Sequence, residues 1–315
     1  MKITVLDKIS FTVGDIDLSY LSSLGDVSYY DVLSKEEVLK ACKDADIVIC
    51  NKTIFDKDLI SSLPNLKYIG VTATGYNNID LEYAKERKIV VTNVPGYSTV
   101  DVAQHVFAFI LHYSNKVYAY DKSVKDGDWL KSKTFCYFDM PLMELDGKTL
   151  GIVGYGDIGK RVASIATAMG MKVIVYNRSI KEMPYTQVDK ETLLKESDFI
   201  TLHCPLNDGT RNFINKETLS LMKPTAVLIN TARGPVVNEY DLKEALDNGV
   251  IAHAMVDVLS IEPMQKDCPL INAKNITFTP HIAWAPKETR QRLICKVADN
   301  IKAFIDRNPI NVVNK

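Results

Sequence analysis

The sequence predicts an α/β protein with two domains, each built on a parallel β-sheet. Short runs rich in β-branched residues alternate with segments of helical periodicity along almost the whole chain, as expected for parallel strands joined by covering helices. This alternation occurs in two series, separated by the turn-forming stretch "NVPGYST" at residues 93–99. A length of 315 residues is sufficient for two domains with separate cores.

The composition is that of an ordinary soluble protein. Hydrophobic residues make up 46% of the chain and charged residues 24%. The net charge of −1 gives no electrostatic basis for binding nucleic acid or an acidic membrane. Lys2, Asp7 and Lys8 interrupt the apolar core that a signal peptide would need, and no window reaches the roughly 18 apolar residues of a membrane helix. We therefore expect a cytoplasmic protein that binds neither nucleic acid nor membranes.

The cysteines indicate a reducing environment. There are six, widely separated and without a CxxC pair: Cys42, Cys50, Cys136, Cys204, Cys268 and Cys295. Most lie in apolar runs. We expect buried, reduced thiols, with no disulfide and no metal site.

The first series contains four candidate strands, and a long helix follows the break. The strands are residues 2–7, 45–50, 67–71 and 88–93. Residues 34–45 have apolar residues at helical spacing, with Ser34 suited to cap the helix N-terminus. After Pro95 and Gly96, the pattern predicts one helix from about Val100 to Tyr120. Apolar residues cover most of its circumference, so we expect it to be buried between domains or against another subunit.

The second series contains six candidate strands. These are residues 148–156, 171–177, 198–204, 226–232, 251–258 and 275–280. An amphipathic helix follows Trp284, with its apolar face formed by Leu293, Ile294, Val297, Ile301, Phe304 and Ile305. The chain ends in a strand-like "INVVN" at residues 310–314.

A glycine-rich turn lies at the start of the second series, between a strand and a helix. In "GYGDIG", Gly154 permits a tight turn, Gly156 lets a phosphate approach the backbone, and Gly159 lets the helix pack close to the sheet. Asp157 and Ile158 begin the helix, whose free N–H groups and dipole favour negative charge. Within a β-α-β unit of this length, the motif predicts dinucleotide binding.

The strand after this helix lacks the acidic residue that usually holds the adenosine ribose. Asn177, Arg178 and Ser179 stand there instead. Asn177 can form hydrogen bonds without repelling a 2′-phosphate, and Arg178 and Ser179 can pair with one. This pattern favours acceptance of NADP(H). The alternative, that Asn177 binds the ribose of NAD and Arg178 points to solvent, stays open.

Further polar residues follow the ends of three other strands. Arg233, Asp257 and His281 would share one sheet edge with the glycine turn, where open α/β sheets bind ligands. A guanidinium can bind a carboxylate and polarise a carbonyl. A carboxylate such as Glu262 would orient His281 and stabilise its protonated ring, which makes a proton donor. Each residue alone could equally be a surface residue, and His203 also lies at a strand end.

A possible counterpart lies in the first series. Thr74 and Gly75 follow a strand, and consecutive backbone N–H groups there would suit a small carboxylate. An ordinary turn explains these two residues equally well.

Taken together, these motifs resemble the D-isomer-specific 2-hydroxyacid dehydrogenase family, over nearly the whole chain. The motifs, in order, are "TATGYNNID", "NVPGYSTVDVAQHVFAFIL", "GKTLGIVGYGDIG", "NTARGPVVNE", "DVLSIEP" and "TPHIAWAP". "VPGYST", "NTARGPVV" and "TPHIAWAPKE" look most similar to the glycerate dehydrogenase, or hydroxypyruvate reductase, branch.

The resemblance implies a role for each candidate. Arg233 would bind the substrate carboxylate and polarise the keto oxygen, His281 would protonate that oxygen, and Glu262 would support His281. Thr74 and Gly75 would offer N–H groups to the substrate carboxylate. The remaining implied cofactor contacts are Asp157, Ile158, Thr231, Ala232, Arg233, Asp257 for the nicotinamide carboxamide, and residues 281–284 with His281 and Trp284.

The resemblance also implies an architecture. A flavodoxin-like substrate domain would comprise residues 1–99 and 285–315, and an NAD(P)-binding Rossmann domain would comprise residues 100–284. A cleft between them would exclude water during hydride transfer. The family is usually homodimeric.

The implied activity is that of an NAD(P)-dependent oxidoreductase acting on a small 2-ketoacid or 2-hydroxyacid. Hydroxypyruvate and D-glycerate are the first expectation, and glyoxylate or another D-2-hydroxyacid is the alternative. Trp284, Tyr76 and the segment 135–143 could shape that choice. A different class, a dinucleotide-sensing corepressor-like protein, would not need the complete catalytic set of Arg233, Glu262 and His281, which is present here. Some corepressor relatives keep this set too, so the alternative stays open.

Overall fold

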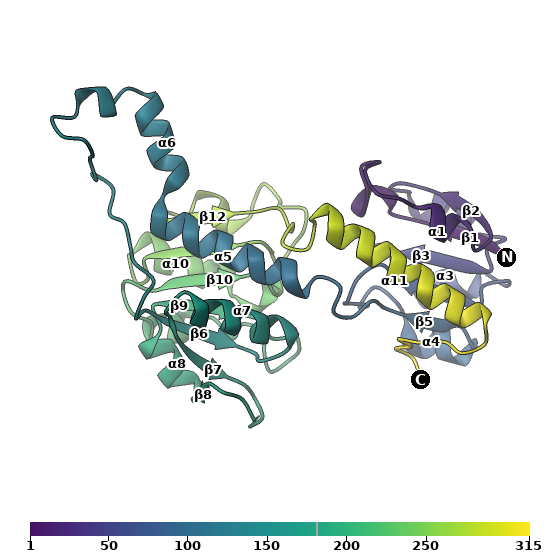
Figure 1. Ribbon diagram of the computed structural model, residues 1–315. Helices are drawn as coiled ribbons and strands as arrows, with labels where there is room; N and C mark the ends of the chain where they lie inside the picture. Colours follow the sequence, from purple (N-terminus) through teal and green to yellow (C-terminus); the bar gives the residue numbers. More distant parts are fainter. Residues whose placement is uncertain (181) are drawn as a thin grey trace. The chain divides into compact units, whose positions relative to one another are not determined.

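The computed structural model describes residues 1–180 and 182–315, which form two compact units. Unit 1 comprises Met1–Ser98 and Trp284–Lys315, and unit 2 comprises Thr99–Ala283. Each unit contains one sheet in which every neighbouring pair of named strands is parallel (Figure 1). The predicted fold class, two parallel-sheet α/β domains, is confirmed.

The sheet of unit 1 has five strands in the order 2-1-3-4-5, the order of flavodoxin-like sheets. In this spatial order they are β2 (Asp26–Tyr29), β1 (Lys2–Val5), β3 (Ile47–Cys50), β4 (Tyr68–Val71) and β5 (Val90–Thr92). The helices that connect them are η1 (Lys8–Ser10), α1 (Ser19–Ser22), α2 (Lys35–Cys42), α3 (Lys57–Ser61) and α4 (Leu81–Glu86). Ser34 caps α2 as predicted, in a reciprocal capping box with Glu37.

The two ends of this sheet differ from expectation. The edge strand β2 was not predicted, because its sequence "DVSY" is short and its side chains remain partly exposed. The predicted strand at residues 310–314 is reduced to one antiparallel bridge between Val312 and Thr92.

The C-terminal helix α11 (Lys287–Ile305) covers one face of this sheet (Figure 1). Four residues of its predicted apolar face, Leu293, Ile294, Val297 and Ile301, are buried in a cluster with β-strand residues such as Tyr68. Phe304 packs against the ring of Tyr68 at a centroid distance of 4.9 Å. Ile305, which the sequence placed on the same face, is exposed because the helix ends there.

The sheet of unit 2 has seven strands, with the order expected of a doubly wound sheet. They are β12 (Ile276–Phe278), β11 (His253–Val256), β10 (Val227–Asn230), β9 (Phe199–Leu202), β6 (Thr149–Val153), β7 (Lys172–Tyr176) and β8 (Thr186–Gln187). The two-residue edge strand β8 was not predicted. The direction of winding changes between β6 and β9, and such switch points form ligand-binding crevices at the carboxyl ends of the strands.

Helices cover both faces of this second sheet. One face packs on α5 (Thr99–Asn115) and α7 (Asp157–Ala168). The other packs on α8 (Lys190–Glu196), α9 (Lys216–Ser220) and α10 (Glu239–Asp247). The remaining helices of unit 2 are α6 (Val117–Lys125), η2 (Trp129–Lys131), η3 (Gly234–Val236) and η4 (Pro269–Asn272).

The single helix predicted from Val100 to Tyr120 is wrong in its second half. Lys116 adopts a left-handed backbone conformation with φ of 50°, which ends α5 and starts α6 in a new direction. Residues of α5 such as Val106 and Ile110 are buried as predicted, whereas Val117 is exposed.

The six cysteines are free thiols. Cys42, Cys50 and Cys204 are buried, and burial raises the pKa of Cys42 to about 12 and that of Cys204 to about 11. The other three are only partly buried, so the prediction of burial holds for half of the set. Within the described residues, no cluster of His, Cys, Asp or Glu could hold a metal ion, and no helix is long and apolar enough to span a membrane.

Candidate active site

The glycine turn after β6 has the backbone geometry that dinucleotide binding requires. Gly154 has a φ of 97°, and a Cβ there would lie 2.9 Å from backbone atoms of His203 and Cys204. A Cβ on Gly159 would lie 2.3 Å from the Gly154 carbonyl oxygen, so helix α7 packs directly on the turn. At Gly156, by contrast, a Cβ would meet no atom within 4 Å. The open side of the turn is therefore where a ligand can approach the backbone.

The N-terminus of α7 lies at this turn. Gly156 is the N-cap residue and has no side chain to cap the helix, and the first α-helical bond runs from the Lys160 N–H to the Gly156 carbonyl. The N–H groups of Asp157, Ile158 and Gly159 therefore face the helix end. Such N–H groups and the helix dipole bind phosphate, so these residues fit a dinucleotide.

The turn after β7 is held by amide side chains. Asn177 accepts from the Tyr155 N–H at 3.3 Å through Oδ1 and donates to the Ser179 carbonyl at 2.9 Å through Nδ2. Gln187, from β8, donates to the carbonyls of both Asn177 and Ser179. Arg178 and Ser179 are exposed. These contacts fix a turn without a carboxylate at the position where a ribose would bind.

The loop after β10 presents Arg233. Buried Asn230 fixes this loop, because its Nδ2 donates to the Arg233 carbonyl and its Oδ1 accepts from the Ala232 N–H, both at 3.0 Å. The guanidinium is exposed, and within the described residues it donates one hydrogen bond, to the Ala232 carbonyl at 2.7 Å. The Thr231 hydroxyl is buried and has no partner among the residues that the structure describes.

Gly234 brings the Arg233 loop against the loop that follows β11. A Cβ on Gly234 would lie 1.9 Å from the carbonyl carbon of Leu259, so the two backbones are in direct contact. The Leu259 N–H donates to Oε1 of Glu262 at 3.0 Å. Close backbone packing therefore positions Arg233 and Glu262 in one part of unit 2. As predicted, Asn238 caps the following helix α10.

His281 and Glu262 form a hydrogen-bonded pair. Nδ1 of His281 lies 2.7 Å from Oε2 of Glu262, and about 30% of each side chain is exposed. A carboxylate at this nitrogen favours the tautomer, or the protonated ring, with hydrogen on Nδ1. Nε2, on the opposite side of the ring, is then the nitrogen that can meet a substrate.

Asp257 holds the turn that carries His281. Its carboxylate is almost completely buried and accepts from the Thr279 hydroxyl at 2.6 Å, the Ile282 N–H at 2.8 Å and the Ala283 N–H at 3.0 Å. Its carbonyl accepts from the His281 N–H at 2.8 Å. The sequence placed Asp257 beside a cofactor, and its contacts with this turn were not foreseen. His203, the other histidine at a strand end, bonds to Thr201, and desolvation lowers its pKa to about 3.

In unit 1, Thr74 and Gly75 follow β4. The Thr74 hydroxyl donates to the Val94 carbonyl at 3.1 Å, and Asn93 donates to the Thr74 carbonyl at 2.7 Å. In the described part of the chain, the backbone N–H groups of Thr74 and Gly75 donate no hydrogen bond. Two successive N–H groups are therefore available to an anion.

A buried carboxylate that the sequence did not identify holds the neighbouring loop. Asp7, at the end of β1, accepts from the N–H groups of Asn51, Lys52 and Thr53 at 2.9, 2.9 and 3.0 Å. Asn51 donates to the Thr72 carbonyl at 3.0 Å, and Asn78 donates to the Thr53 carbonyl at 2.8 Å. The loops after β3 and β4 are thus tied together. Its position at the end of the strand predicted over residues 2–7 was the only sequence signal for Asp7.

The candidates are divided between the units. Unit 2 contains the glycine turn, Arg233, Asp257, Glu262 and His281, whereas unit 1 contains Thr74, Gly75 and Trp284. Trp284 lies edge-on to Tyr97, with ring centroids 6.2 Å apart, next to helix α11. The chain therefore changes units directly after the turn that carries His281.

Comparison with known proteins finds a matching family model and similar full-chain sequences. Residues 107–283 match the family model for the D-isomer specific 2-hydroxyacid dehydrogenase, NAD binding domain. A hydroxypyruvate reductase from Blautia hydrogenotrophica is 43% identical over 322 aligned positions, which cover all of both chains. A glycerate dehydrogenase from Methylorubrum extorquens is 42% identical over 287 positions, 90% of each chain.

A solved structure of an acyclic imino acid reductase (Bsp5) in complex with NADPH and D-Arg is also similar. It is 35% identical, with a TM-score of 0.87, and the match covers 99% of this chain and 100% of that one. The family model covers more than half of the chain, and both relatives are more than 40% identical over 90% or more of it. The chain belongs to the D-isomer-specific 2-hydroxyacid dehydrogenase family and is a D-2-hydroxyacid dehydrogenase with an NAD(P)-binding domain.

Proposed function

We propose that this enzyme reduces a small 2-ketoacid, with hydroxypyruvate as the preferred substrate and D-glycerate as the product. The observation that carries the proposal is the 2.7 Å contact between His281 and Glu262, at the same sheet edge as Arg233 and the glycine turn. The names of the two full-length relatives support hydroxypyruvate as the first choice. Glyoxylate is the second.

Arg233 binds and polarises the substrate in this proposal. Its exposed guanidinium has N–H groups that can form bidentate hydrogen bonds with a carboxylate and also donate to the neighbouring keto oxygen. Polarisation of that oxygen makes the carbonyl carbon a better acceptor. The bound nicotinamide cofactor supplies the hydride.

His281 supplies the proton. From the protonated ring, the Nε2–H donates to the keto oxygen, which becomes the hydroxyl of the product, while the Nδ1–H stays hydrogen-bonded to Glu262. Asp257 keeps the ring in place through the turn. Its Oδ2, which has one partner among the described residues, can also accept from the carboxamide of the cofactor. In the reverse direction, His281 takes the proton from the 2-hydroxyl group.

In unit 1, the N–H groups of Thr74 and Gly75 are suited to bind a small carboxylate. They have no partner within the described residues, and the bonds of Thr74 with Val94 and Asn93 hold the loop. The residues 1–99 and 285–315 therefore form the substrate domain in this proposal, and residues 100–284 form the cofactor domain.

We further propose that NADP(H) is accepted well, alongside NAD(H). No carboxylate closes β7, and Arg178 and Ser179 are exposed on a turn that Asn177 and Gln187 hold. A 2′-phosphate would therefore meet a guanidinium and a hydroxyl rather than a repelling charge.

The decisive experiment is a panel of initial rates with NADH and NADPH in parallel. The panel contains hydroxypyruvate, glyoxylate, pyruvate and bulkier 2-ketoacids, and a parallel set contains each 2-ketoacid with methylamine. We expect hydroxypyruvate without methylamine to give the highest kcat/KM of the panel. No turnover of any 2-ketoacid would overturn the proposal, and activity that depends on the amine would reassign the substrate to an imino acid.

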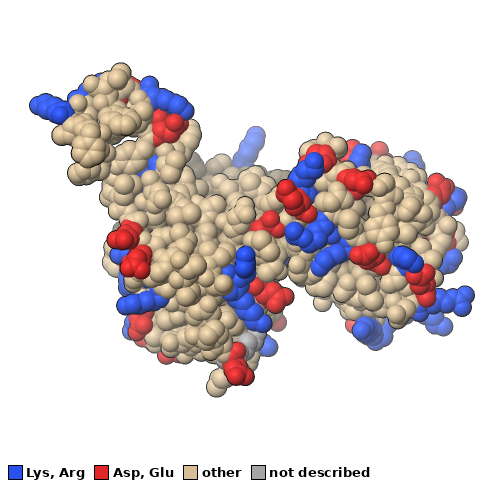
Figure 2. Space-filling model, in the orientation of Figure 1, with Lys and Arg blue, Asp and Glu red and all other residues tan. Residues whose placement is uncertain are grey.

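We also propose that the enzyme is a homodimer. Residues 117–144, the projecting segment, extend away from the sheet of unit 2 (Figure 1), and uncharged atoms cover much of this segment (Figure 2). Five of its large apolar side chains are between 51% and 91% exposed: Trp129, Leu130, Phe135, Phe138 and Leu142. Exposed apolar patches of this kind mark interaction surfaces.

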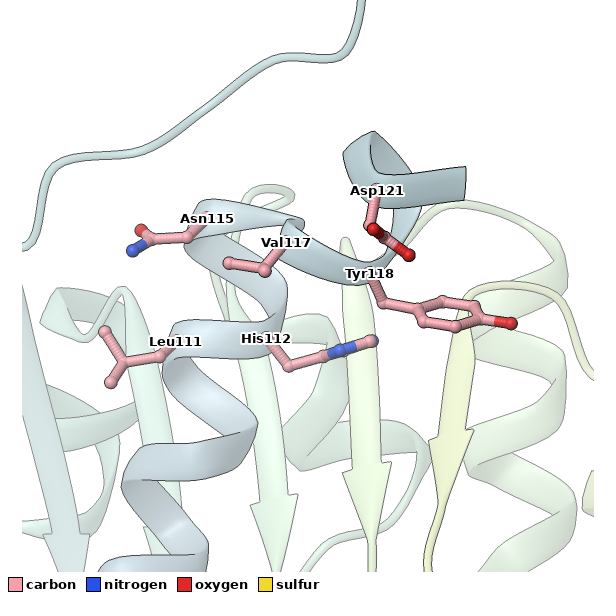
Figure 3. A pocket seen from close by; sticks show the side chains of 6 residues that line it. All are labelled: Leu111, His112, Asn115, Val117, Tyr118 and Asp121. Carbon is pink, nitrogen blue, oxygen red and sulfur yellow. The ribbon is translucent and has the colours of Figure 1, made fainter. Parts of the chain in front are cut away.

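A second copy of the chain is the occupant that we propose for this surface. At the junction of α5 and α6, a hollow of about 530 Å³ is lined by Leu111, His112, Asn115, Val117, Tyr118 and Asp121 (Figure 3). None of these residues belongs to the candidate active site, and a two-fold arrangement would let each copy offer both hollow and apolar segment. Light scattering should give twice the chain mass of 35.3 kDa. A mass of one chain at micromolar concentration would exclude the dimer.

A further inference from the structure

A chain of hydrogen bonds connects helix α5 to the turn that carries His281. Nε2 of His105, on α5, lies 3.0 Å from the hydroxyl oxygen of Thr279. That hydroxyl donates to Oδ1 of Asp257 at 2.6 Å. The side chain of His105 is 18% exposed and that of Asp257 is 1% exposed, so both bonds are largely shielded from water. His105 has no role in the chemistry proposed above.

The direction of each hydrogen bond follows from the atoms involved. The Asp257 carboxylate accepts, so the single hydrogen of the Thr279 hydroxyl is used in that bond. The hydroxyl oxygen can then only accept from His105, whose Nε2 must carry a hydrogen. Burial lowers the pKa of His105, and the nearby Asp257 charge opposes this only in part. The ring is therefore neutral at pH 7 and is the tautomer with hydrogen on Nε2.

This series of hydrogen bonds, from His105 through Thr279 to Asp257, ends at the backbone around His281. Asp257 accepts from the N–H groups of Ile282 and Ala283, and its carbonyl accepts from the N–H of His281 itself. His281 has a φ of 53°, a left-handed conformation that residues with a side chain adopt only where the surroundings enforce it. The hydrogen bonds of Asp257 enforce the left-handed conformation of His281, and the Thr279 hydroxyl orients Asp257.

We propose that His105 is a positioning residue, which holds the proton donor His281 in its working orientation through Thr279 and Asp257. The proposal rests on the proposed role of His281 as proton donor. His105 touches neither the His281 ring nor Glu262 in any hydrogen bond of the described residues, so it acts through the turn. Without the His105 Nε2–H, the Thr279 hydroxyl and Asp257 should be held less firmly. The His281 ring should then be less well aligned with the keto oxygen.

The test compares two replacements of His105. In His105→Gln, the amide nitrogen occupies the place of Nε2 and keeps the donor to Thr279. The ring of His105 lies edge-on to Phe109, with ring centroids 4.6 Å apart. In His105→Phe, the new ring can keep this contact but has no hydrogen-bond donor for Thr279. We expect the Phe variant to lose about tenfold in kcat, since small misplacements of a catalytic group are costly. KM for the nicotinamide cofactor should stay within about twofold, because the glycine turn is untouched.

A solvent isotope effect separates positioning from general damage. Poorly aligned proton transfer becomes slower relative to the other steps, so the effect of D2O on kcat should grow in the Phe variant and remain at the wild-type value in the Gln variant. Equal losses in both variants would mean that packing alone matters. A Phe variant with wild-type kcat and isotope effect would also overturn the proposal.

A second pair of variants covers the case in which His105→Phe does not fold. Thr279→Ser keeps the hydroxyl and Thr279→Val removes it at nearly constant volume, so only Val should reproduce the loss of kcat. A normal rate in Thr279→Val would overturn the proposal. His281→Ala, measured with the same substrate, keeps the two hypotheses distinct. If His281→Ala is nearly inactive while His105→Phe is normal, only the positioning role of His105 fails. If His281→Ala is fully active, the proposed role of His281 as proton donor fails, and the positioning role of His105 fails with it.

Discussion

The imidazole of His281 lies 2.7 Å from the carboxylate of Glu262, and the other oxygen of that carboxylate accepts from the Leu259 N–H. The bond from Leu259 helps to hold the carboxylate, and the carboxylate in turn orients the ring. The two residues of this pair, His281 and Glu262, are 19 residues apart in the sequence. Such an arrangement suits the proton donor that we propose for reduction of the ketone.

His281→Ala should lower kcat by about 10²- to 10⁴-fold, the usual contribution of a general acid. Binding of the cofactor, followed by the fluorescence of NADH or NADPH, should remain close to wild type. Glu262→Gln, which keeps the shape of the side chain but not its charge, should lower kcat less. Near-normal kcat/KM in His281→Ala would show that another group donates the proton.

Arg233→Ala should lower kcat and raise the KM of the 2-ketoacid together. The guanidinium is expected to bind the carboxylate in both the ground state and the transition state, and also to polarise the keto oxygen. Each effect should be about tenfold or more, as for loss of a charged hydrogen bond. Arg233→Lys is the matched control, because it keeps the charge without the fork and should recover only part of the rate. A change confined to KM would remove the polarising role.

Arg178→Ala should raise the KM of NADPH by about tenfold and leave that of NADH nearly unchanged. NADPH differs from NADH only by its 2′-phosphate, so an arginine that binds this group should affect NADPH alone. Lys172→Ala provides a control, because this exposed lysine begins the same strand at its opposite end. An equal change for both cofactors would mean that Arg178 does not contact the 2′-phosphate.

Asp7→Asn should raise the KM of the 2-ketoacid several-fold without a comparable change in the KM of the cofactor. The amide would lose acceptor capacity toward Asn51, Lys52 and Thr53, and the loops after β3 and β4 would lose their shared anchor. Asp31→Asn is a suitable control, since Asp31 is an exposed carboxylate in the same unit. Unchanged kinetics in Asp7→Asn would limit that network to folding.

Stability should fall as the pH drops from about 6.5 toward 4. Burial lowers the pKa of His203 to about 3 and that of His253 to about 4, whereas an unfolded histidine titrates near 6.5. Between these values the unfolded chain binds more protons, so acid favours unfolding. At pH 5, each of the two histidines should contribute about 2 kcal/mol of destabilisation relative to pH 8.

Urea denaturation of wild type and His203→Gln at pH 8 and pH 5 measures this effect. The variant cannot titrate at that position and should lose less stability between the two pH values. The same pH dependence in wild type and His203→Gln would contradict the prediction.

Local patterns made much of the site predictable. The glycine turn, the strand ends before Arg233, Asp257 and His281, and the amide caps depend on residues within a few positions of one another. Parallel strands end at one sheet edge, so their order along the chain was sufficient to bring these residues together. The same reasoning failed at Lys116, where apolar periodicity continues past a left-handed residue that ends the helix.

The sequence by itself determined the two parallel-sheet domains, the dinucleotide turn and the set of strand-end side chains, because backbone preference and hydrophobic period are local properties. Only the tertiary structure decided which side chains hold that set in place. Asp7 meets a loop 44 to 46 residues away, and His105 meets Thr279 across 174 residues. Contacts of this kind depend on how helices and loops pack over the sheets, and no period in the sequence encodes the packing distance between them.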